Sequence, residues 1–243
     1  MNKTKWENMV RSEKHSVCTS ENTDKQFNAN LINSLNWTGN IADGSNGYSE
    51  VDAVFYVPCI GPNSPQGSIY GSWVGLGGEG NPNLVQAGVV GSYLLGTFTY
   101  YAFIENIAAL YPGAVKVYNV NCNDRMQVEI CCSNSMTVND GTTGQYFSEY
   151  YGPSASHSTA EWIVEKLIGN DNPLANFQSE TFYGMGDTDL VTGSYDGPYW
   201  QQHDYSVAYD NSGYNLMNIG GLVYNSAYGP PNDSNTITWA RSQ

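Results

Sequence analysis

The sequence predicts an all-β fold in which two antiparallel sheets pack face to face. Short runs of apolar, aromatic and β-branched residues recur along the chain, and clusters of Gly, Asn and Pro separate them. The length of 243 residues suits one large sandwich, and a 40% share of hydrophobic residues, with 13% aromatic, can fill its core. This composition disfavours a disordered chain.

About eleven of these runs are expected to be strands. They cover residues 51–57, 68–75, 84–93, 97–104, 114–120, 126–132, 145–151, 161–168, 204–209, 219–224 and 235–239. The stretch 160–168 also fits a helical period, but its short length favours a strand.

Residues 1–35 are expected to form an extension or a propeptide-like arm, because they mix charges with Asn and Ser and lack strand alternation. They hold five of the nine bases, namely Lys3, Lys5, Arg11, Lys14 and Lys25. Such a leader could sit on an acidic cleft and dissociate when the carboxylates of the cleft are protonated. Residues 36–243 are expected to form the sandwich domain.

The net negative charge disfavours some classes of binding partner. The chain has 23 acids and 9 bases, a formal charge of −14, which argues against binding to nucleic acid or to anionic membranes. Few cations remain after residue 35 to repel one another in acid, so the body is expected to survive at low pH. Ordinary tuning of solubility by acidic residues is the alternative explanation.

The cysteine content does not show whether the protein works in an oxidising or a reducing compartment. The five cysteines, Cys18, Cys59, Cys122, Cys131 and Cys132, lack the spacing of a zinc site and can form two disulfides at most. No run reaches the roughly 18 apolar residues of a spanning helix, and the first 30 residues lack the apolar core of a signal peptide. Either an export signal preceded Met1 or the chain is not exported.

Common catalytic templates are missing from the sequence. It contains no G-x-S-x-G, H-E-x-x-H, P-loop or Asp-Thr/Ser-Gly pattern. His15, His157 and His203 are widely separated, as is typical of solvated or structural histidines. The stretch 186–189 is only a weak hint of a metal site. The tyrosine-rich stretch 193–229 either lines a polymer-binding groove or reflects strand preference.

Alternation predicts which side chains share a face in two of the strands. Glu161, Ile163 and Glu165 would lie on one face, opposite Trp162, Val164 and Lys166. Leu84, Gln86 and Gly88 would likewise oppose Val85, Ala87 and Val89, which face the core. We expect Gly88 to leave open space beside the Gln86 amide, and apolar neighbours to raise the pKa of a carboxyl such as that of Glu161.

Five segments, taken in order, resemble the glutamic peptidases of the eqolisin family, which are acid endopeptidases. They are Asn36-Trp37-Thr38-Gly39, Gly71-Ser72-Trp73-Val74-Gly75-Leu76-Gly77-Gly78, Leu84-Val85-Gln86-Ala87-Gly88-Val89, the region 100–105 with Tyr111-Pro112, and Ala160-Glu161-Trp162-Ile163-Val164-Glu165. Phe177 and the SETFYG run after it also match the next strand of the family. The similarity spans about residues 36–185, and its order argues against chance.

The resemblance implies a concanavalin A-like sandwich of two bent, seven-stranded antiparallel sheets with a catalytic dyad on the concave face. It assigns catalysis to Gln86 and Glu161, with no metal and no organic cofactor. One carboxyl can act as general base to water and then as general acid to the departing nitrogen, while the Gln86 amide stabilises the oxyanion. We therefore expect a monomeric, secreted endopeptidase that acts on polypeptides, with no nucleic-acid or membrane partner.

Further site residues also come from the resemblance. Trp73 matches a tryptophan that walls the active site, and Trp37 and Glu105 match positions near the cleft. The chain departs from the family pattern at residues 75–78 and 101–105, where two acids and two aromatic residues are missing. Fewer acids near the dyad should repel a carboxylate less and change the pH optimum.

Two alternative functions remain open from the sequence. A carbohydrate-binding or glycan-cleaving sandwich would use the same architecture, and Glu161 with Glu165 could be proposed as its carboxyl pair. Their separation along a strand is too large for that chemistry unless the segment is helical. A catalytically silent adhesion or scaffold module is the second alternative.

Overall fold

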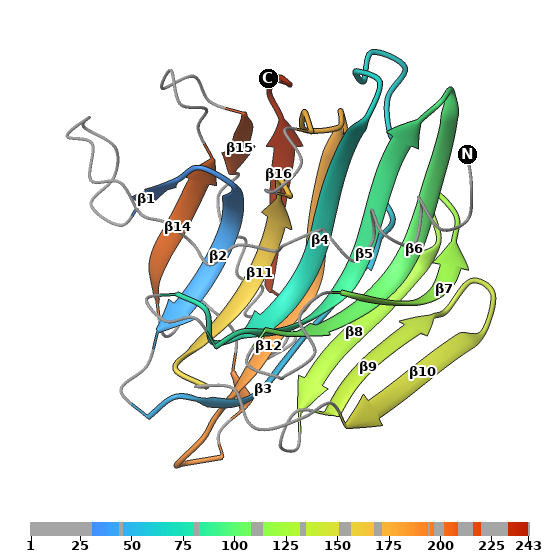
Figure 1. The fold of residues 1–243 in the computed structure, drawn as a ribbon. Helices are drawn as coiled ribbons and strands as arrows, with labels where there is room; N and C mark the ends of the chain where they lie inside the picture. The colour runs from blue at the N-terminus through green and yellow to red at the C-terminus, as the bar shows by residue number, and fades with distance from the viewer. Residues whose placement is uncertain are drawn as a thin grey trace.

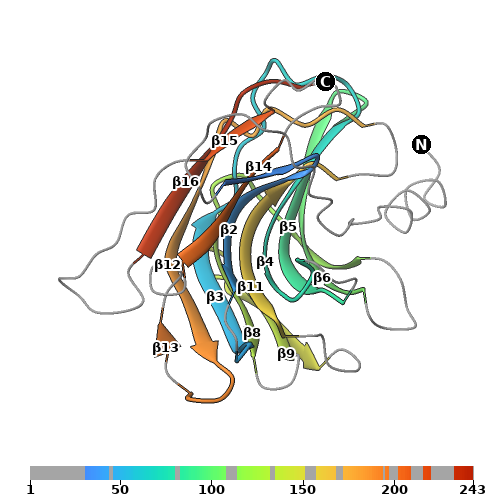
Figure 2. The same cartoon turned by 90° about the vertical axis from the view of Figure 1, so that its left-hand side faces the viewer.

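The structure is a computed structural model, and it describes residues 31–43, 46–79, 83–107, 114–131, 135–150, 157–167, 172–193, 195–196, 202–208, 216–219 and 233–242. Within these ranges the regular elements are strands, which build two sheets that lie face to face (Figures 1 and 2). The predicted all-β sandwich is therefore confirmed. No helix in this part of the chain is long and apolar enough to cross a membrane.

The first sheet has eight strands, in the order β1-β14-β2-β11-β4-β5-β6-β7. Their bounds are β1 (Leu31–Ser34), β14 (Gln202–Ala208), β2 (Trp37–Asp43), β11 (Thr159–Glu165), β4 (Ser68–Leu76), β5 (Val85–Leu94), β6 (Thr97–Asn106) and β7 (Val115–Val120). Neighbouring strands are antiparallel except β1 and β14, which are parallel. Strand β1 lies inside the range 1–35, so the sheet begins earlier than predicted.

The second sheet also has eight strands. Seven follow the order β10-β9-β8-β3-β12-β16-β15, and β13 pairs with β12 beside this path. Their bounds are β10 (Gln145–Tyr150), β9 (Ser135–Asp140), β8 (Arg125–Cys131), β3 (Tyr48–Tyr56), β12 (Ser179–Asp189), β16 (Asp233–Trp239), β15 (Met217–Ile219) and β13 (Tyr195–Asp196). Each sheet thus has one strand more than the resemblance implies.

The main hydrophobic core lies between the two sheets. Val85, Ala87 and Val89 of β5 enter it from the first sheet, as predicted, and Phe55 of β3 and Phe182 of β12 enter it from the second. The two phenylalanine rings meet edge to face, with centroids 5.5 Å apart. Alternation then sends the other residues of β5 to the opposite face of the first sheet.

A second buried cluster covers that opposite face. Its members come from the first sheet and the loops beside it, and they are Trp37, Ile41, Ile69, Trp73, Leu84, Val90, Tyr101, Phe103, Ala114, Ile163 and Leu167. Figure 2 shows that this face is the concave side of the bent sheet. The presence of Leu84 and Ile163 here confirms the predicted faces of β5 and β11, and it places Gln86 and Glu161 on the concave face.

The predicted strands are present wherever the structure describes them, with shifted ends, and the stretch 159–165 is a strand rather than a helix. The run 219–224 meets β15 only at Ile219, and its remaining residues lie outside the described ranges. Strands β1, β2, β9, β12 and β13 are not among the predicted runs, although β2 and β12 overlap segments that carry the family resemblance. In β9 only Met136 and Val138 face the core, among Ser, Thr, Asn and Asp residues that are typical of turns.

The carboxyl group of Glu180 is buried between the sheets. Glu180 of β12 is buried, and its Oε2 accepts a hydrogen bond of 3.0 Å from Ser72 Oγ of β4, while its Oε1 has no partner. Burial raises the pKa of Glu180 well above 4.5, although the bond from Ser72 lowers it in part. The folded protein therefore favours the neutral, protonated carboxyl.

The raised pKa makes stability depend on pH in a defined direction. The contribution of Glu180 is fully present below about pH 4.5 and is lost as the pH rises through the higher pKa of the folded state. Glu180→Gln removes this titration, so its free energy of unfolding should fall less between about pH 4 and pH 7 than that of the wild type. Urea denaturation at both pH values measures this, and an equal fall in both proteins would contradict it.

Candidate active site

Four residues in one row across the concave face form the candidate site. In the register of the first sheet, Glu161 of β11 pairs with Gly75 of β4, and Gly75 pairs with Gln86 of β5. Gln86 pairs in turn with Glu105 of β6. Neighbouring strands lie about 4.8 Å apart, so the Cα atoms of Glu161 and Gln86 are about 10 Å apart, with a glycine between them.

Gly75 is needed because other side chains already occupy the space above it. A Cβ at this position would lie 2.8 Å from Trp73 Cζ3, 2.9 Å from Leu84 Cδ1 and 3.0 Å from Glu161 Oε2. The Glu161 carboxyl therefore leans over Gly75, toward the strand that carries Gln86. A larger residue at position 75 would collide with the carboxyl and with the tryptophan beside it.

Glu161 is fully buried, and its two oxygens have different surroundings. Oε1 accepts a hydrogen bond from the Thr159 hydroxyl, while Oε2 has no hydrogen-bond partner. Burial raises the pKa of Glu161 well above 4.5, and the Thr159 hydroxyl lowers it. The nearby Glu79 carboxylate raises the pKa again, while the backbone N–H of Glu79 lowers it. The sequence predicted that the dyad would have fewer acids beside it, yet Glu79 supplies a repelling charge directly after the glycine run.

Gln86 is held by Glu105. Its Nε2 donates to Glu105 Oε2 at 2.6 Å, and both side chains are buried. A carboxylate can only accept, so this bond fixes which end of the amide is the nitrogen. The Gln86 Oε1 atom has no hydrogen-bond partner. Each member of the predicted pair therefore presents one unpaired acceptor on the same row of the sheet.

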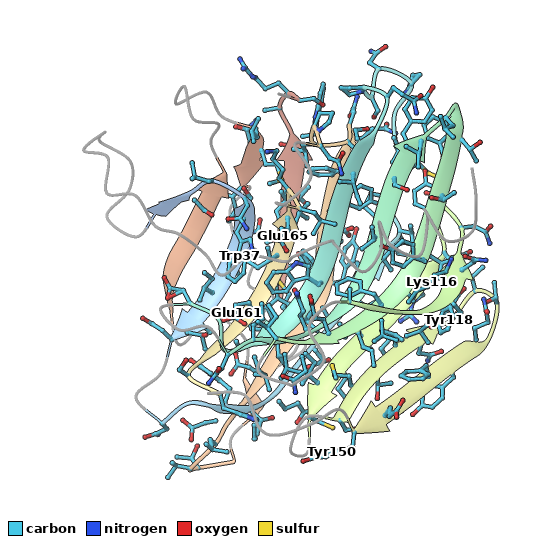
Figure 3. All side chains as sticks on the ribbon, in the orientation of Figure 1. Trp37, Lys116, Tyr118, Tyr150, Glu161 and Glu165 are labelled. Carbon is cyan, nitrogen blue, oxygen red and sulfur yellow. A yellow bond between two sulfur atoms is a disulfide. The ribbon has the colours of Figure 1, made fainter. Side chains whose placement is uncertain are left out.

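Trp73 stands next to this row and is held by a polar network. Its Nε1 donates to Glu165 Oε2 at 3.0 Å, and Glu165 Oε1 accepts from Asn36 Nδ2 at 3.1 Å. Its ring meets that of Trp37 edge to face, with centroids 5.0 Å apart. Figure 3 shows Glu161 and Glu165 along β11 with Trp37 beside them. The structure thus brings Trp37, Trp73 and Glu105 to the two predicted catalytic residues.

The prediction for Gly88 was wrong, because no open space lies beside it. A Cβ at Gly88 would lie 2.1 Å from the backbone oxygen of Ser72 and 2.7 Å from Trp73 Cα. The glycine instead allows β4 and β5 to approach closely one row away from the dyad.

The other candidates from the sequence do not join the site. A ring nitrogen of His157 lies 2.7 Å from the Tyr48 carbonyl oxygen, which is a structural contact. Asp189 accepts hydrogen bonds from the backbone N–H of Thr192 and from Asn46, and these bonds lower its pKa to about 2. Among the described residues, no three His, Cys, Asp or Glu side chains could hold a metal ion.

Some predicted features lie outside what the structure describes. They are the side chains of His15 and His203 and those of the aromatic residues between 199 and 228. Three contributors within the described part are absent from the sequence prediction, namely Thr159, Gly75 and the support of Trp73 by Glu165. All three contributors depend on the register between strands, which the sequence does not give. Only the E-x-x-x-E spacing of β11 indicated that Glu165 lies on the same face as Glu161.

The chain is similar in sequence and in fold to known proteins. The model of the Peptidase A4 family matches residues 35–196. Aspergillopepsin-2 from Aspergillus niger is 28% identical over 181 residues, which cover 61% of this chain and 62% of that protein. The chain therefore matches less than two thirds of the length of that relative.

Solved structures show the same fold. Scytalido-glutamic peptidase with a transition state analog inhibitor has a TM-score of 0.67 and 19% identity, covering 84% of this chain and 98% of that one. Aspergilloglutamic peptidase from Aspergillus niger has a TM-score of 0.56 and 25% identity, covering 71% and 99%. The resemblance to glutamic peptidases is thereby confirmed. Because the family model covers most of the chain and spans the whole row from Gly75 to Glu161, the chain belongs to the Peptidase A4 family.

Proposed function

We propose that the protein is an acid endopeptidase in which Glu161 and Gln86 hydrolyse peptide bonds without a metal or an organic cofactor. The observation that carries the proposal is the pair of unpaired, buried acceptors, Glu161 Oε2 and Gln86 Oε1, on either side of Gly75. An unpaired buried polar group costs about 1–3 kcal/mol, so two at one place call for a functional explanation. A reactive water held between them would satisfy both.

The proposed reaction needs only these side chains. The Glu161 carboxylate takes a proton from the water, whose oxygen attacks the peptide carbonyl carbon. The carbonyl oxygen becomes an oxyanion, to which the second N–H of Gln86 donates while Glu105 holds the first. The protonated Glu161 then gives its proton to the peptide nitrogen as the C–N bond breaks, and the carboxylate is restored.

The surroundings of Glu161 suit both proton transfers in a weakly acidic medium. A group that first accepts and then donates a proton works best when its pKa lies near the working pH. Burial, together with the Glu79 carboxylate, moves the pKa of Glu161 upward from 4.5. The pKa shift therefore supports activity on the acidic side of neutrality.

The chain that covers Gln86 and Glu161 would have to move before a substrate binds, because both side chains are fully buried. Leu84 lies over the row, with its Cδ1 within 3.1 Å of a Cβ placed on Gly78. Gly77 and Gly78 have φ values of 73° and 118°, which glycine adopts at little cost. A displacement of Leu84 and this glycine pair would admit a substrate to the carboxyl.

The glycan-cleaving alternative has less support. It requires two carboxyls about 5–5.5 Å apart, whereas residues four apart in a strand have Cα atoms about 13 Å apart. Both oxygens of Glu165 also accept hydrogen bonds from other side chains. Glu165 therefore supports the site rather than reacting in it.

We also infer that the protein works outside the cell, as a monomer, on polypeptide substrates. The Cys59–Cys122 disulfide supports an oxidising compartment. The formal charge of −14 disfavours nucleic acid and anionic membranes as partners. Residues 36–243 would form the peptidase domain, preceded by the basic extension 1–35, in which Leu31–Ser34 is a strand that joins the sheet.

The dyad is tested by substitution of each member. Glu161→Gln and Gln86→Ala should each lower cleavage of unfolded casein between about pH 2 and pH 7 by a factor of 10² or more, because proton transfer and oxyanion stabilisation are lost. Glu180→Gln is the matched control, since it alters another buried glutamate, which belongs to β12 of the second sheet and lies between the two sheets. Cleavage that persists in Glu161→Gln, or an equal loss in Glu180→Gln, would refute the assignment.

Gly75→Ala tests the row itself. The added methyl group would press on Glu161 Oε2 and Trp73, so cleavage should fall by about 10²-fold while the protein still folds. Gly141→Ala is the control, because its Cβ would lie 3.2 Å from the side chain of Arg125 and no closer to any other atom. Cleavage rates and thermal unfolding of both variants decide the matter, and an active Gly75→Ala protein would count against the geometry.

Glu165 is proposed as a positioning residue that holds Trp73. Trp73 Nε1 can only donate, so in Glu165→Gln the amide oxygen should stay toward Trp73 and the amide nitrogen should face the donor Asn36 Nδ2. The bond to Asn36 is then lost, and kcat should fall about tenfold. Adding Asn36→Asp restores a donor–acceptor pair and should recover most of kcat. A variant that loses only thermal stability, or a double variant without recovery, would show that Glu165 is merely structural.

A further inference from the structure

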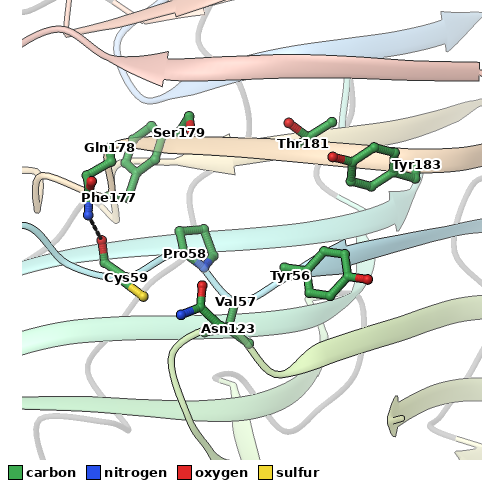
Figure 4. Close-up of a pocket in the computed structure, with 10 residues that line it drawn as sticks. All are labelled: Tyr56, Val57, Pro58, Cys59, Asn123, Phe177, Gln178, Ser179, Thr181 and Tyr183. Atoms are coloured by element: carbon green, nitrogen blue, oxygen red, sulfur yellow. Dashed lines mark hydrogen bonds between the residues drawn. The ribbon is translucent and has the colours of Figure 1, made fainter. Parts of the chain in front are cut away.

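A pocket lies on the outer face of the second sheet, away from the dyad. Its volume is about 310 Å³, and Figure 4 shows the residues that line it. They are Tyr56, Val57, Pro58, Cys59, Asn123, Phe177, Gln178, Ser179, Thr181 and Tyr183. Phe55 and Phe182, the neighbours of Tyr56 and Tyr183 in sequence, point into the core, so the two tyrosines point outward.

A disulfide and side-chain hydrogen bonds hold the residues that line the pocket in place. The Cys59–Cys122 disulfide closes a loop of 63 residues beside it. Asn123 and Gln178 have φ values of 68° and 62°, in the left-handed region, which is unfavourable for residues other than glycine. Gln178 is held there because its Nε2 donates to the Cys59 carbonyl at 3.0 Å and its N–H donates to Asn176 Oδ1 at 3.1 Å.

Two exposed aromatic rings stand at one end of the pocket. Tyr56 and Tyr183 are 51% and 46% exposed, and their rings meet edge to face with centroids 6.5 Å apart. Exposed tyrosines that brace each other in this way offer a rigid apolar face with hydroxyl groups at its rim. Neutral polar side chains, those of Ser179, Thr181 and Asn123, continue the lining.

The lining chemistry selects the class of ligand. None of the ten lining side chains is charged, and the chain carries a net charge of −14, so an anionic ligand would be repelled. A peptide that binds by strand addition needs an open sheet edge, but β3 pairs with β8 and β12, and β12 pairs with β3 and β16. The apolar faces and hydroxyl groups of a sugar match tyrosine rings surrounded by neutral hydrogen-bonding groups.

From these contacts we propose that the pocket binds a neutral polysaccharide and so anchors the protein to a carbohydrate matrix. The bound polymer would lie on the opposite side of the main core from Glu161, so it takes no part in hydrolysis. This inference stands independently of the proposed peptidase activity. It gives the protein a second, non-catalytic binding site.

Native gels cast with a polysaccharide test this proposal. At about pH 6 the acidic protein migrates to the anode. A neutral polymer in the gel slows the protein only if the protein binds it, because an uncharged polymer has no electrostatic attraction for the protein. Hydroxyethyl cellulose, laminarin and galactomannan are the probes, and polygalacturonate is the anionic control. We expect at least one neutral probe to retard the wild type, and Tyr183→Ala to weaken this binding about tenfold.

Tyr146→Ala is the matched variant, because Tyr146 is 65% exposed on β10, outside the pocket. It should bind like the wild type, and casein cleavage should be unchanged in both tyrosine variants. The proposal is overturned if no neutral probe retards the wild type, if both variants bind equally, or if casein peptides displace the polysaccharide. Retardation without any cleavage would refute the peptidase proposal alone.

Discussion

The concave site depends on the register of β11, β4 and β5. Because side chains alternate in a strand, a slip of one residue would turn Glu161 or Gln86 into the main core. The register is fixed by close backbone approaches in the next row, where Ile163 pairs with Gly39 and Trp73 pairs with Gly88. A Cβ at Gly39 would lie 1.9 Å from the Trp162 carbonyl oxygen. Glycine is therefore required both to set the register and, at position 75, to leave room for the carboxyl.

Three of the four buried glutamates in the described part of the chain differ in the surroundings of their carboxyl groups. Glu165 accepts hydrogen bonds on both oxygens, whereas Glu161 and Glu180 each have one oxygen without a hydrogen-bond partner. Glu161 differs from Glu180 in lying on the concave face, in the same row as Gln86. Burial raises the pKa of both Glu161 and Glu180, so the folded state favours their neutral forms. Acidic conditions then stabilise the fold by the same physical effect that tunes the site. The scarcity of cations predicts survival at low pH on separate grounds.

Alternation and composition were enough to predict the sandwich and the faces of β5 and β11, because a period of two is a local property of the chain. Resemblance to a family supplied the pair Gln86 and Glu161, which are ordinary strand residues when taken alone. Register is not local, so neither the position of Gly75 between them nor the bond from Trp73 to Glu165 could be derived from the sequence. Gly88 was misjudged for the same reason, since the space beside a glycine depends on the neighbouring strand. Strand β9 escaped prediction because two apolar residues among turn formers are too weak a pattern.

The two faces of the sandwich can specialise because the main core separates them. Glu161 and Tyr183 belong to different sheets with the main core between them, so a substitution at one should leave the other unaffected. The concave face keeps bulk solvent away from the buried Glu161 carboxyl, which raises its pKa. The outer face keeps its tyrosines exposed over a wall fixed by a disulfide, which suits binding of a polymer without chemistry. If both proposals hold, one face of the sandwich would anchor the protein to a polysaccharide and the other would cleave peptide bonds.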